Sequence, residues 1–386
     1  MKQRLSRIFA GVLALLILNT ASPSLANIQL DMKMEEAGDS FVEYPQLAGM
    51  DNAFVRDAVN TAMKSAVEQH LNTLGILQAG TAGSLQVSSQ AMIWPSSDGH
   101  DLLTVLLTAH GRMPNGRLGF QQIPLQFDLA NAQPVGPEAV FTNPPDAKAW
   151  IENYLQEEFA DALSNYLDLD AITPFPLERL LITKTGITFF YLENTLTWLS
   201  GRSASIHFLF HELENSLNMQ EGSYLDNLGI PDLLAVSNET AQQIMDTVVQ
   251  GSLTGLDASL GDLLVEVIER NKLQYDPEGF PDGEKYQLED DRYRGTVLIS
   301  RDSEQVYGML SSRINLYGLI TGRTKKEEAV EVLGQPVASI PMDFAAAGLY
   351  GFPEGTLDSY LFGQNELRLY YTQEEILHSI WLQQTK

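Results

Sequence analysis

The chain has 386 residues, of which 50 are Asp or Glu and 24 are Lys or Arg, so its formal net charge is −26. So acidic a protein repels nucleic acid and anionic lipid, because both are bound through Lys and Arg. The sequence contains no Cys, which excludes disulfides, thiol catalysis and Cys-ligated zinc. An apolar content of 44% at this length predicts a globular protein of two or three domains.

The N-terminus has the pattern of a secretory signal peptide. Lys2, Arg4 and Arg7 precede an apolar run over residues 8–18, and the small residues Ser24 and Ala26 offer a cleavage site. The apolar run is shorter than the roughly 20 residues that a membrane-spanning helix needs. We therefore expect residues 1–26 to be removed, leaving a secreted, extracytoplasmic chain without a transmembrane anchor.

Helix and strand patterns cluster in the first half of the mature chain. Apolar residues recur at helical spacing over 51–74 and 146–167. Between and after these helices the patterns predict strands over 85–94, 102–110 and 118–129 as an antiparallel meander, two strands joined by a tight turn over 180–192, and one strand over 205–210. Strands that cluster in this way indicate an α+β domain, assigned to residues 27–216.

The second half repeats this organisation after a helical and acidic linker over 217–294. The linker holds helical patterns at 239–250 and 260–272 and a turn-rich acidic loop at 275–294. Thr324 and Glu327 form a predicted capping box for a helix over 325–333, which Gly334 ends. Strands are predicted over 295–300, 305–310, 357–362, 367–371 and 376–382. Residues 295–386 thus form a second α+β domain, so each of the two domains is expected to be an antiparallel sheet packed with one or two helices.

Two segments of the first domain resemble a bacterial envelope domain of unknown function. Residues 44–52 read Tyr-Pro-Gln-Leu-Ala-Gly-Met-Asp-Asn, and residues 182–191 read Ile-Thr-Lys-Thr-Gly-Ile-Thr-Phe-Phe-Tyr. The resemblance is to the RsiV/PdaC-type domain, found in lysozyme-sensing anti-sigma factors and ahead of peptidoglycan deacetylases. Because only seven residues precede the apolar run, we expect no sigma-binding region, and no deacetylase motif follows residue 216.

A second resemblance covers residues 295–386. Residues 322–330 read Gly-Arg-Thr-Lys-Lys-Glu-Glu-Ala-Val, and Leu-Gly-Gln-Pro follows at 333–336. Similar Gly-x-Thr helices that end in Leu-Gly-x-Pro occur in secreted envelope modules. The resemblance implies a binding or scaffold domain. Because the motif consists mainly of helix capping and termination, it indicates fold more than function.

His207, His211 and Glu212 are weak candidates for catalysis. Two His four residues apart share one face of a strand, and with a nearby carboxylate they suggest a zinc site or a hydrolase. The alternative is a polar, solvent-facing side of the strand, because no third ligand follows from the spacing.

The acidic loop and the aromatic residues supply weaker candidates for binding. Asp276, Glu278, Asp282 and Glu284 could bind Ca²⁺, although their spacing is not that of an EF-hand and a solvated loop is the default interpretation. Large rings that could contact a sugar or a protein are Tyr44, Trp198, Tyr350 and Phe352.

The sequence contains none of the common hydrolase, dinucleotide or nucleoside-triphosphate motifs, so we expect no cofactor. The leading hypothesis is a secreted, non-catalytic bacterial envelope protein. It would bind a cell-wall glycan or a cationic protein such as a lysozyme. The alternatives are a peptidoglycan-directed hydrolase and an envelope assembly or scaffold factor.

Overall fold

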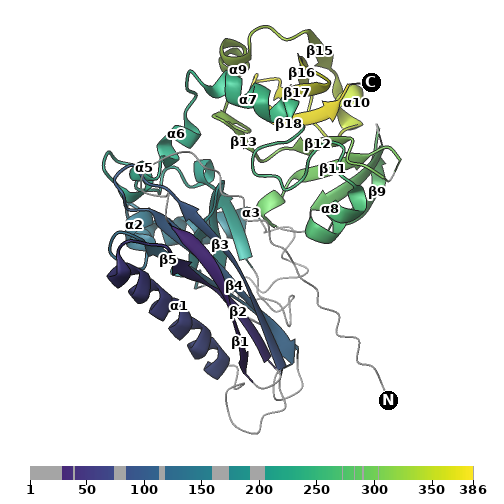
Figure 1. Cartoon of the computed structure of the whole chain (residues 1–386). Coiled ribbons are helices and arrows are strands. Elements are labelled where there is room, and N and C mark those ends of the chain that lie inside the picture. The colour runs from purple at the N-terminus through teal and green to yellow at the C-terminus, as the bar shows by residue number, and fades with distance from the viewer. Residues whose placement is uncertain are drawn as a thin grey trace, which may run out of the picture.

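The computed structural model describes residues 28–37, 40–73, 84–112, 118–158, 174–191, 205–271, 273–281, 283–288, 291–302 and 304–385. Figure 1 shows two lobes, an N-terminal lobe (residues 28–238) in purple to teal and a C-terminal lobe (residues 239–385) in green to yellow. The expected signal peptide lies outside the described residues. Within them, no helix has both the length and the apolar composition needed to cross a bilayer.

A five-stranded sheet covered by one long helix forms most of the N-terminal lobe (Figure 1). In sheet order the strands are β1 (Gln29–Ala37), β2 (Ser40–Ala48), β3 (Ser84–Trp94), β4 (Leu102–Arg112) and β5 (Leu118–Asp128). The predicted antiparallel meander of β3, β4 and β5 is confirmed. The β1–β2 hairpin was not predicted, and β2 pairs with β3 in parallel.

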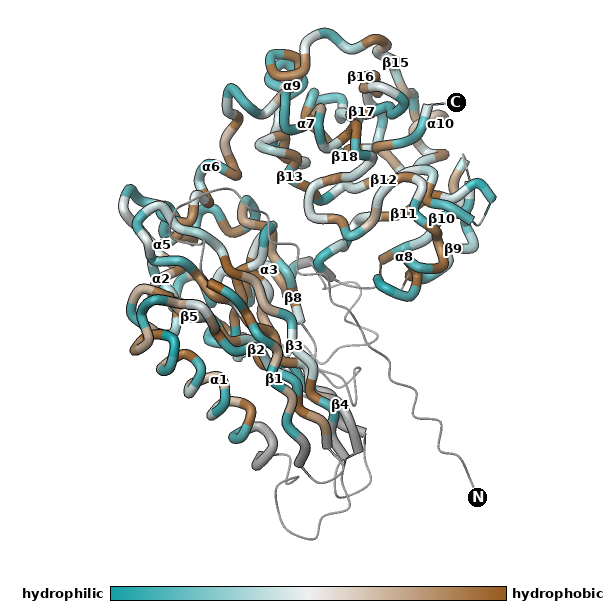
Figure 2. Tube along the Cα trace, viewed as in Figure 1, coloured by the Kyte–Doolittle hydropathy of each residue, from teal (hydrophilic) through white to brown (hydrophobic). Residues whose placement is uncertain are grey.

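Helix α1 (Ala53–Thr73) packs on this sheet through one apolar stripe. Val55, Val59, Met63 and Val67 recur every four residues and are buried together with alternate residues of β4. The hydropathy colouring of Figure 2 shows brown segments along the strands that face the helix. The helical spacing read from the sequence is therefore the spacing that builds this core.

The residues of the first resemblance motif hold β2 against α1. Asn60 of α1 accepts a hydrogen bond from the Leu47 backbone N–H at 2.8 Å and donates one to the Leu47 carbonyl at 3.1 Å. The Tyr44 hydroxyl donates to Glu35 at 3.0 Å, and the Tyr44 side chain is 0% exposed. This motif thus stabilises the fold.

A second layer of the lobe is a three-stranded antiparallel sheet with short helices around it. Its strands are β6 (Leu180–Ile182), β7 (Gly186–Phe190) and β8 (Ser205–Leu209), and its helices are α2 (Pro137–Val140), α3 (Pro144–Glu158), α5 (Tyr224–Asn227) and α6 (Ile230–Leu234). The predicted tight turn between β6 and β7 is confirmed by a 2.8 Å hydrogen bond from Thr183 N to Gly186 O. The predicted helix 146–167 is observed as far as Glu158, and its remainder lies outside the described residues.

The C-terminal lobe contains an eight-stranded sheet in the order β15-β16-β17-β18-β12-β11-β10-β9. The strands are β9 (Leu273–Phe280), β10 (Gly283–Leu288), β11 (Thr296–Ser300), β12 (Gly308–Ser311), β15 (Ala338–Met342), β16 (Gly355–Phe362), β17 (Asn365–Thr372) and β18 (Leu377–Gln384). Apolar side chains of α7 (Thr240–Val249) and α8 (Leu264–Asn271), with Ala329 of α9 (Lys326–Leu333), join the large core on one face. The short helix α10 (Phe344–Gly348) belongs to the other face, and a small hairpin of β13 (Asn315–Leu316) and β14 (Leu319–Ile320) completes the lobe.

Two local predictions in this lobe are wrong. The expected acidic loop at 275–294 contains the hairpin β9–β10. Strand β9 lies at the edge of the sheet, so the missing N–H of Pro277 does not prevent the strand from pairing. Helix α9 is capped by Glu328, which accepts a hydrogen bond from Lys325 N at 2.8 Å, and not by the pair Thr324 and Glu327. The Thr324 hydroxyl instead accepts a hydrogen bond from Ile320 N.

The predicted α+β class is confirmed, while the predicted domain boundaries stay a prediction. The range 217–294 contains α5 and α6, which pack in the core of the three-stranded sheet, and α7 and α8, which pack against the eight-stranded sheet. The residues expected to be a linker therefore contribute to the cores of both lobes.

Replacing Asn60 by Ala should lower the free energy of unfolding by about 1–3 kcal/mol, because two backbone groups of β2 lose their partner. Denaturant unfolding followed by circular dichroism measures this change. Thr61→Ala is the matched control, because Thr61 is exposed and its hydroxyl bonds only within the helix. Equal midpoints for the two variants would contradict the role of Asn60.

Candidate functional site

His207 and His211 do not share a strand face as expected. Strand β8 ends at Leu209, and Phe210–Glu212 form a 3₁₀ helix, so the alternation of the strand stops before His211. His207 is 1% exposed, and its ring nitrogens lie 2.9 Å from Thr188 Oγ1 and 3.3 Å from Thr185 Oγ1. The prediction that the two histidines share one strand face is therefore wrong. The alternative, a solvent-facing side of the strand, is also wrong, because His207 is buried.

Glu212 is bound by an arginine from the C-terminal lobe. Arg313 Nε donates to Glu212 Oε1 at 2.5 Å, and Arg313 Nη2 donates to Glu212 Oε2 at 2.6 Å. The same Nη2 donates to the His207 carbonyl at 2.5 Å. The two side chains are only 10% and 17% exposed. Both carboxylate oxygens are thus held by one guanidinium in a forked geometry, which favours a structural role for Glu212 over acid–base catalysis.

A second ion pair and a partly buried imidazole complete this contact, which we call the joint (residues 207–214 against residues 313–323). Arg323 Nη1 lies 2.5 Å from Glu214 Oε2, in a pair whose side chains are 52% and 36% exposed. The Nδ1 atom of His211 is buried without a hydrogen-bond partner. Burial lowers the pKa of His211, the nearby Arg313 and Arg323 lower it further, and Glu212 opposes them.

Apolar packing also crosses the joint. Ile320 of β14 is 1% exposed and belongs to the core around β6, β7 and β8. Gly318 has a φ of +93°, and a Cβ there would lie 2.7 Å from the Ala235 carbonyl, so the β13–β14 turn lies directly against the end of α6. Asn315 Nδ2 donates to the Leu233 carbonyl at 2.7 Å. The three catalytic candidates therefore lie beside a contact between the lobes.

Tyr350 and Phe352 lie on the second face of the eight-stranded sheet, opposite α7, α8 and α9. Tyr350 packs on Trp381 with ring centroids 5.6 Å apart, and Phe352 packs on Tyr370 at 4.6 Å. Phe352 also contacts the His378 ring at 5.3 Å. Both candidates are partly buried, so their rings cover the sheet and keep some access to solvent.

Polar side chains continue this face beside the aromatic rings. Arg368 of β17 lies over the Trp381 ring at 4.6 Å, and its Nη2 is 3.0 Å from Glu366 Oε2. Gln383 Nε2 donates to the same oxygen at 2.7 Å. Burial would raise the pKa of Glu366, but hydrogen bonds from Arg368, Ser359 and Gln383 hold it below its usual value. We call Tyr350, Phe352, Glu366, Arg368, Trp381 and Gln383 the outer face.

Sequence reasoning missed the arginines of both sites. Arg313 is 101 residues from Glu212, so no local pattern connects them. Arg368 had a usable signal, because Glu366 and Arg368 alternate with buried Leu367 and Leu369 in a strand predicted from the sequence. Two charged residues on one side of a central strand indicate that this side is not closed by a full apolar layer.

The other candidate residues are not brought into either site. Tyr44 is fully buried beneath α1 and cannot present its ring to a partner. Trp198 and Asp282 lie outside the described residues. Asp276 is bound by Lys285 at 2.8 Å and by Gln287 at 2.7 Å, while Glu284 accepts from the Tyr286 hydroxyl. Among the described residues, no group of three or more His, Asp or Glu is arranged to hold a metal ion.

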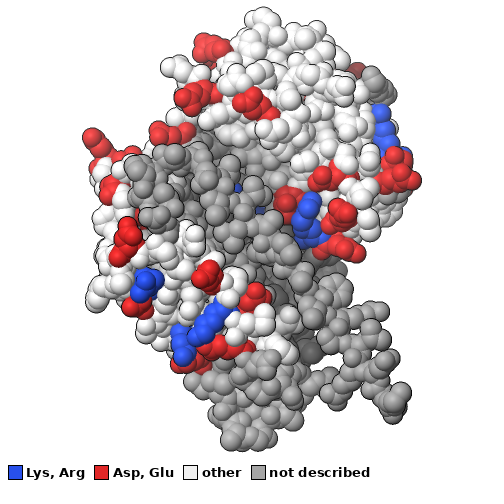
Figure 3. All heavy atoms as spheres, in the orientation of Figure 1, with Lys and Arg blue, Asp and Glu red and all other residues white. Residues whose placement is uncertain are grey.

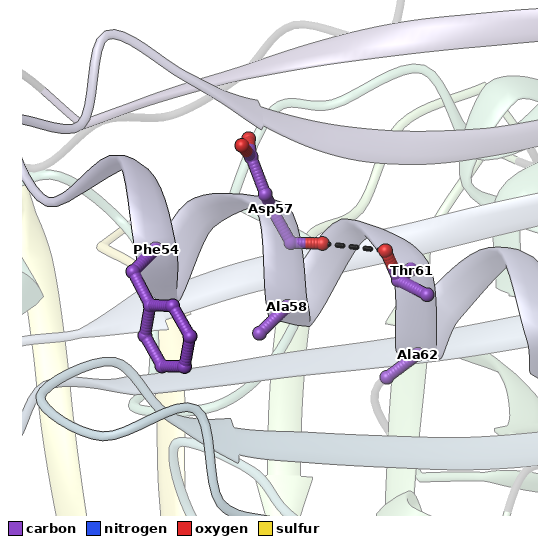
Figure 4. Close-up of a pocket in the computed structure, with 5 residues that line it drawn as sticks. All are labelled: Phe54, Asp57, Ala58, Thr61 and Ala62. Atoms are coloured by element: carbon purple, nitrogen blue, oxygen red, sulfur yellow. Dashed lines mark hydrogen bonds between the residues drawn. The ribbon is translucent and has the colours of Figure 1, made fainter.

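A surface recess lies along the outward side of α1 (Figure 4). Phe54, Asp57, Ala58, Thr61 and Ala62 line it, and the Phe54 side chain is 79% exposed. The Thr61 hydroxyl donates to the Asp57 carbonyl at 2.7 Å within the helix. The lining therefore offers one carboxylate and one apolar ring, which is not a constellation for catalysis.

Comparison with known proteins assigns no family to the chain. No protein-family model matches the sequence, and no curated protein matches it. Two solved DUF3298 proteins, from Bacteroides fragilis and Pseudomonas aeruginosa, are 15% and 11% identical to the chain, with TM-scores of 0.39 and 0.34. Each is similar over 50% of this chain, and 94% and 93% of those chains are covered. A DUF4309 protein from Bacillus subtilis is similar over 38% of this chain and 97% of its own, at 10% identity and a TM-score of 0.24. The similar structures are bacterial domains of unknown function.

Glu212→Gln should lower the free energy of unfolding by about 3–5 kcal/mol, because it leaves the largely buried Arg313 guanidinium without its carboxylate. Glu214→Gln is the matched control and should cost at most about 1 kcal/mol, because its pair with Arg323 is exposed to solvent. Chemical denaturation of both variants measures the difference. A loss for Glu212→Gln no larger than that for Glu214→Gln would show that the buried pair does not stabilise the joint.

Proposed function

We propose that this chain is a secreted bacterial envelope protein that binds a cell-wall glycan without transforming it, and that the outer face is its binding surface. The outer face carries this proposal, because it combines partly exposed aromatic rings with an Arg–Glu–Gln hydrogen-bonding network. Saccharides match such a surface, since their C–H faces pack on rings and their hydroxyl and acetamido groups form hydrogen bonds. The signal-peptide pattern and the two sequence resemblances support the location.

The state of Glu212 supports binding over hydrolysis. A peptidoglycan hydrolase that used Glu212 would need a carboxyl group able to exchange a proton with substrate. Here both oxygens of Glu212 are bound by Arg313, and Leu209 N also donates to Oε2 at 2.7 Å. Incubation of the purified chain with peptidoglycan should therefore release no fragments detectable by mass spectrometry.

Retention on insoluble peptidoglycan tests the outer face. The purified chain should sediment with purified sacculi, and Arg368→Met should weaken retention by about tenfold, as expected for a central Arg contact. Lys64→Met, which removes the same charge from exposed α1, is the matched control and should bind like the wild type. Circular dichroism spectra like that of the wild type would show that both variants are folded. Absence of wild-type retention, or equal retention of Arg368→Met, would refute the assignment.

The charge favours a cationic protein as a second candidate partner. The chain carries a net charge of −26, and Figure 3 shows Asp and Glu over both lobes of the visible face. Calorimetric titration with lysozyme should show binding at about 10 mM NaCl that weakens at about 300 mM, because salt screens exposed charges. Lysozyme with succinylated lysines is the control and should not bind. No heat of binding at low salt would eliminate this partner.

A further inference from the structure

The joint is one of the contacts between the two lobes, and His211 lies among its charged groups. Arg313 crosses from the C-terminal lobe to Glu212 and to the His207 carbonyl, while Arg323 crosses to Glu214. The described charges that act on His211 are Glu212 on its own 3₁₀ helix and Arg313 and Arg323 on the opposite lobe. Its Nδ1 atom is buried without a hydrogen-bond partner.

Protonation of His211 would be unfavourable in the closed joint, because a proton on Nδ1 would find no hydrogen-bond acceptor. Protonated His donates from both ring nitrogens, and a buried donor without an acceptor costs free energy. The added positive charge would also lie near two guanidinium groups, although Glu212 opposes their effect. Separation of the lobes would relieve both penalties by admitting water to the ring.

We propose that His211 makes the joint acid-sensitive, so that proton uptake by its imidazole loosens the contact between residues 207–214 and residues 313–323 and lets the two lobes separate. We call the joint in this role a latch, which is closed while His211 is neutral and opens when His211 is protonated. Such opening would change how the lobes present their surfaces to a partner, whatever that partner is.

The direction of the pH dependence follows from linkage between protonation and opening. In the closed joint the pKa of His211 is lowered below 6.5, chiefly by burial, whereas in the open joint the ring is hydrated and its pKa returns to about 6.5. The open state therefore binds the proton more tightly. The closed state has its full stability above pH 6.5 and loses stability as the pH falls below that value. The ratio of closed to open molecules then falls by up to about tenfold per pH unit.

Distance measurement between the lobes tests this latch. Because the chain has no Cys, Thr61→Cys on α1 and Glu331→Cys on α9 provide the only thiols for two spin labels, both at exposed positions. We expect one narrow distance distribution at about pH 7.5 and a growing longer component as the pH falls below about 6.5. An unchanged distribution in the wild-type sequence down to about pH 5 would overturn the proposal.

Substitutions assign the effect to His211. His211→Gln should remove the pH dependence, whereas His378→Gln should retain it, although burial also lowers the pKa of His378 within the C-terminal lobe. Arg313→Met should give the longer component already at pH 7.5, which tests the latch independently if His211→Gln does not fold. Persistence of the pH response in folded His211→Gln, or a closed Arg313→Met at pH 7.5, would also overturn the proposal.

Discussion

One guanidinium group that is largely withdrawn from water joins the two lobes. Arg313 gives its hydrogen bonds to a carboxylate and a backbone carbonyl of the other lobe, with its side chain 10% exposed. Such a group is costly to bury unless its donors are paired, and here Nε and Nη2 are paired with one short segment of the other lobe. The short turn of β13 and β14 brings the arginine to that segment and adds Ile320 to the opposite core.

This constraint changes the interpretation of the residues nearest to it. His207, His211 and Glu212 resemble a catalytic set in the sequence, yet their neighbours are Thr188, Arg313 and Arg323. A carboxylate held by a forked guanidinium stabilises structure, and the proposed pH response assigns the partly buried imidazole beside it a role in the same contact. The described contacts of Glu212 and His211 are therefore those of the joint.

The two faces of the eight-stranded sheet are covered in different ways. One face carries the large apolar core with α7 and α8, whereas the other is covered in part by the aromatic rings around Tyr350 and Trp381. Arg368 and Glu366 remain at the border of those rings with 21% and 15% of their side chains exposed. A surface that mixes rings with bound charges is suited to a ligand that is itself amphipathic, which is why a wall glycan is the preferred candidate.

The sequence by itself determined the α+β class, α1, the β3–β5 meander and five of the eight strands of the C-terminal sheet, because these depend on local periodicity and turn residues. It did not predict the β9–β10 hairpin, where Pro277 imitates a loop. It named Tyr350, Phe352 and Glu212, but neither Arg368 nor Arg313. Only the tertiary structure decided what those residues contact, since the partners of Glu212 lie about a hundred residues away and burial sets their charge interactions.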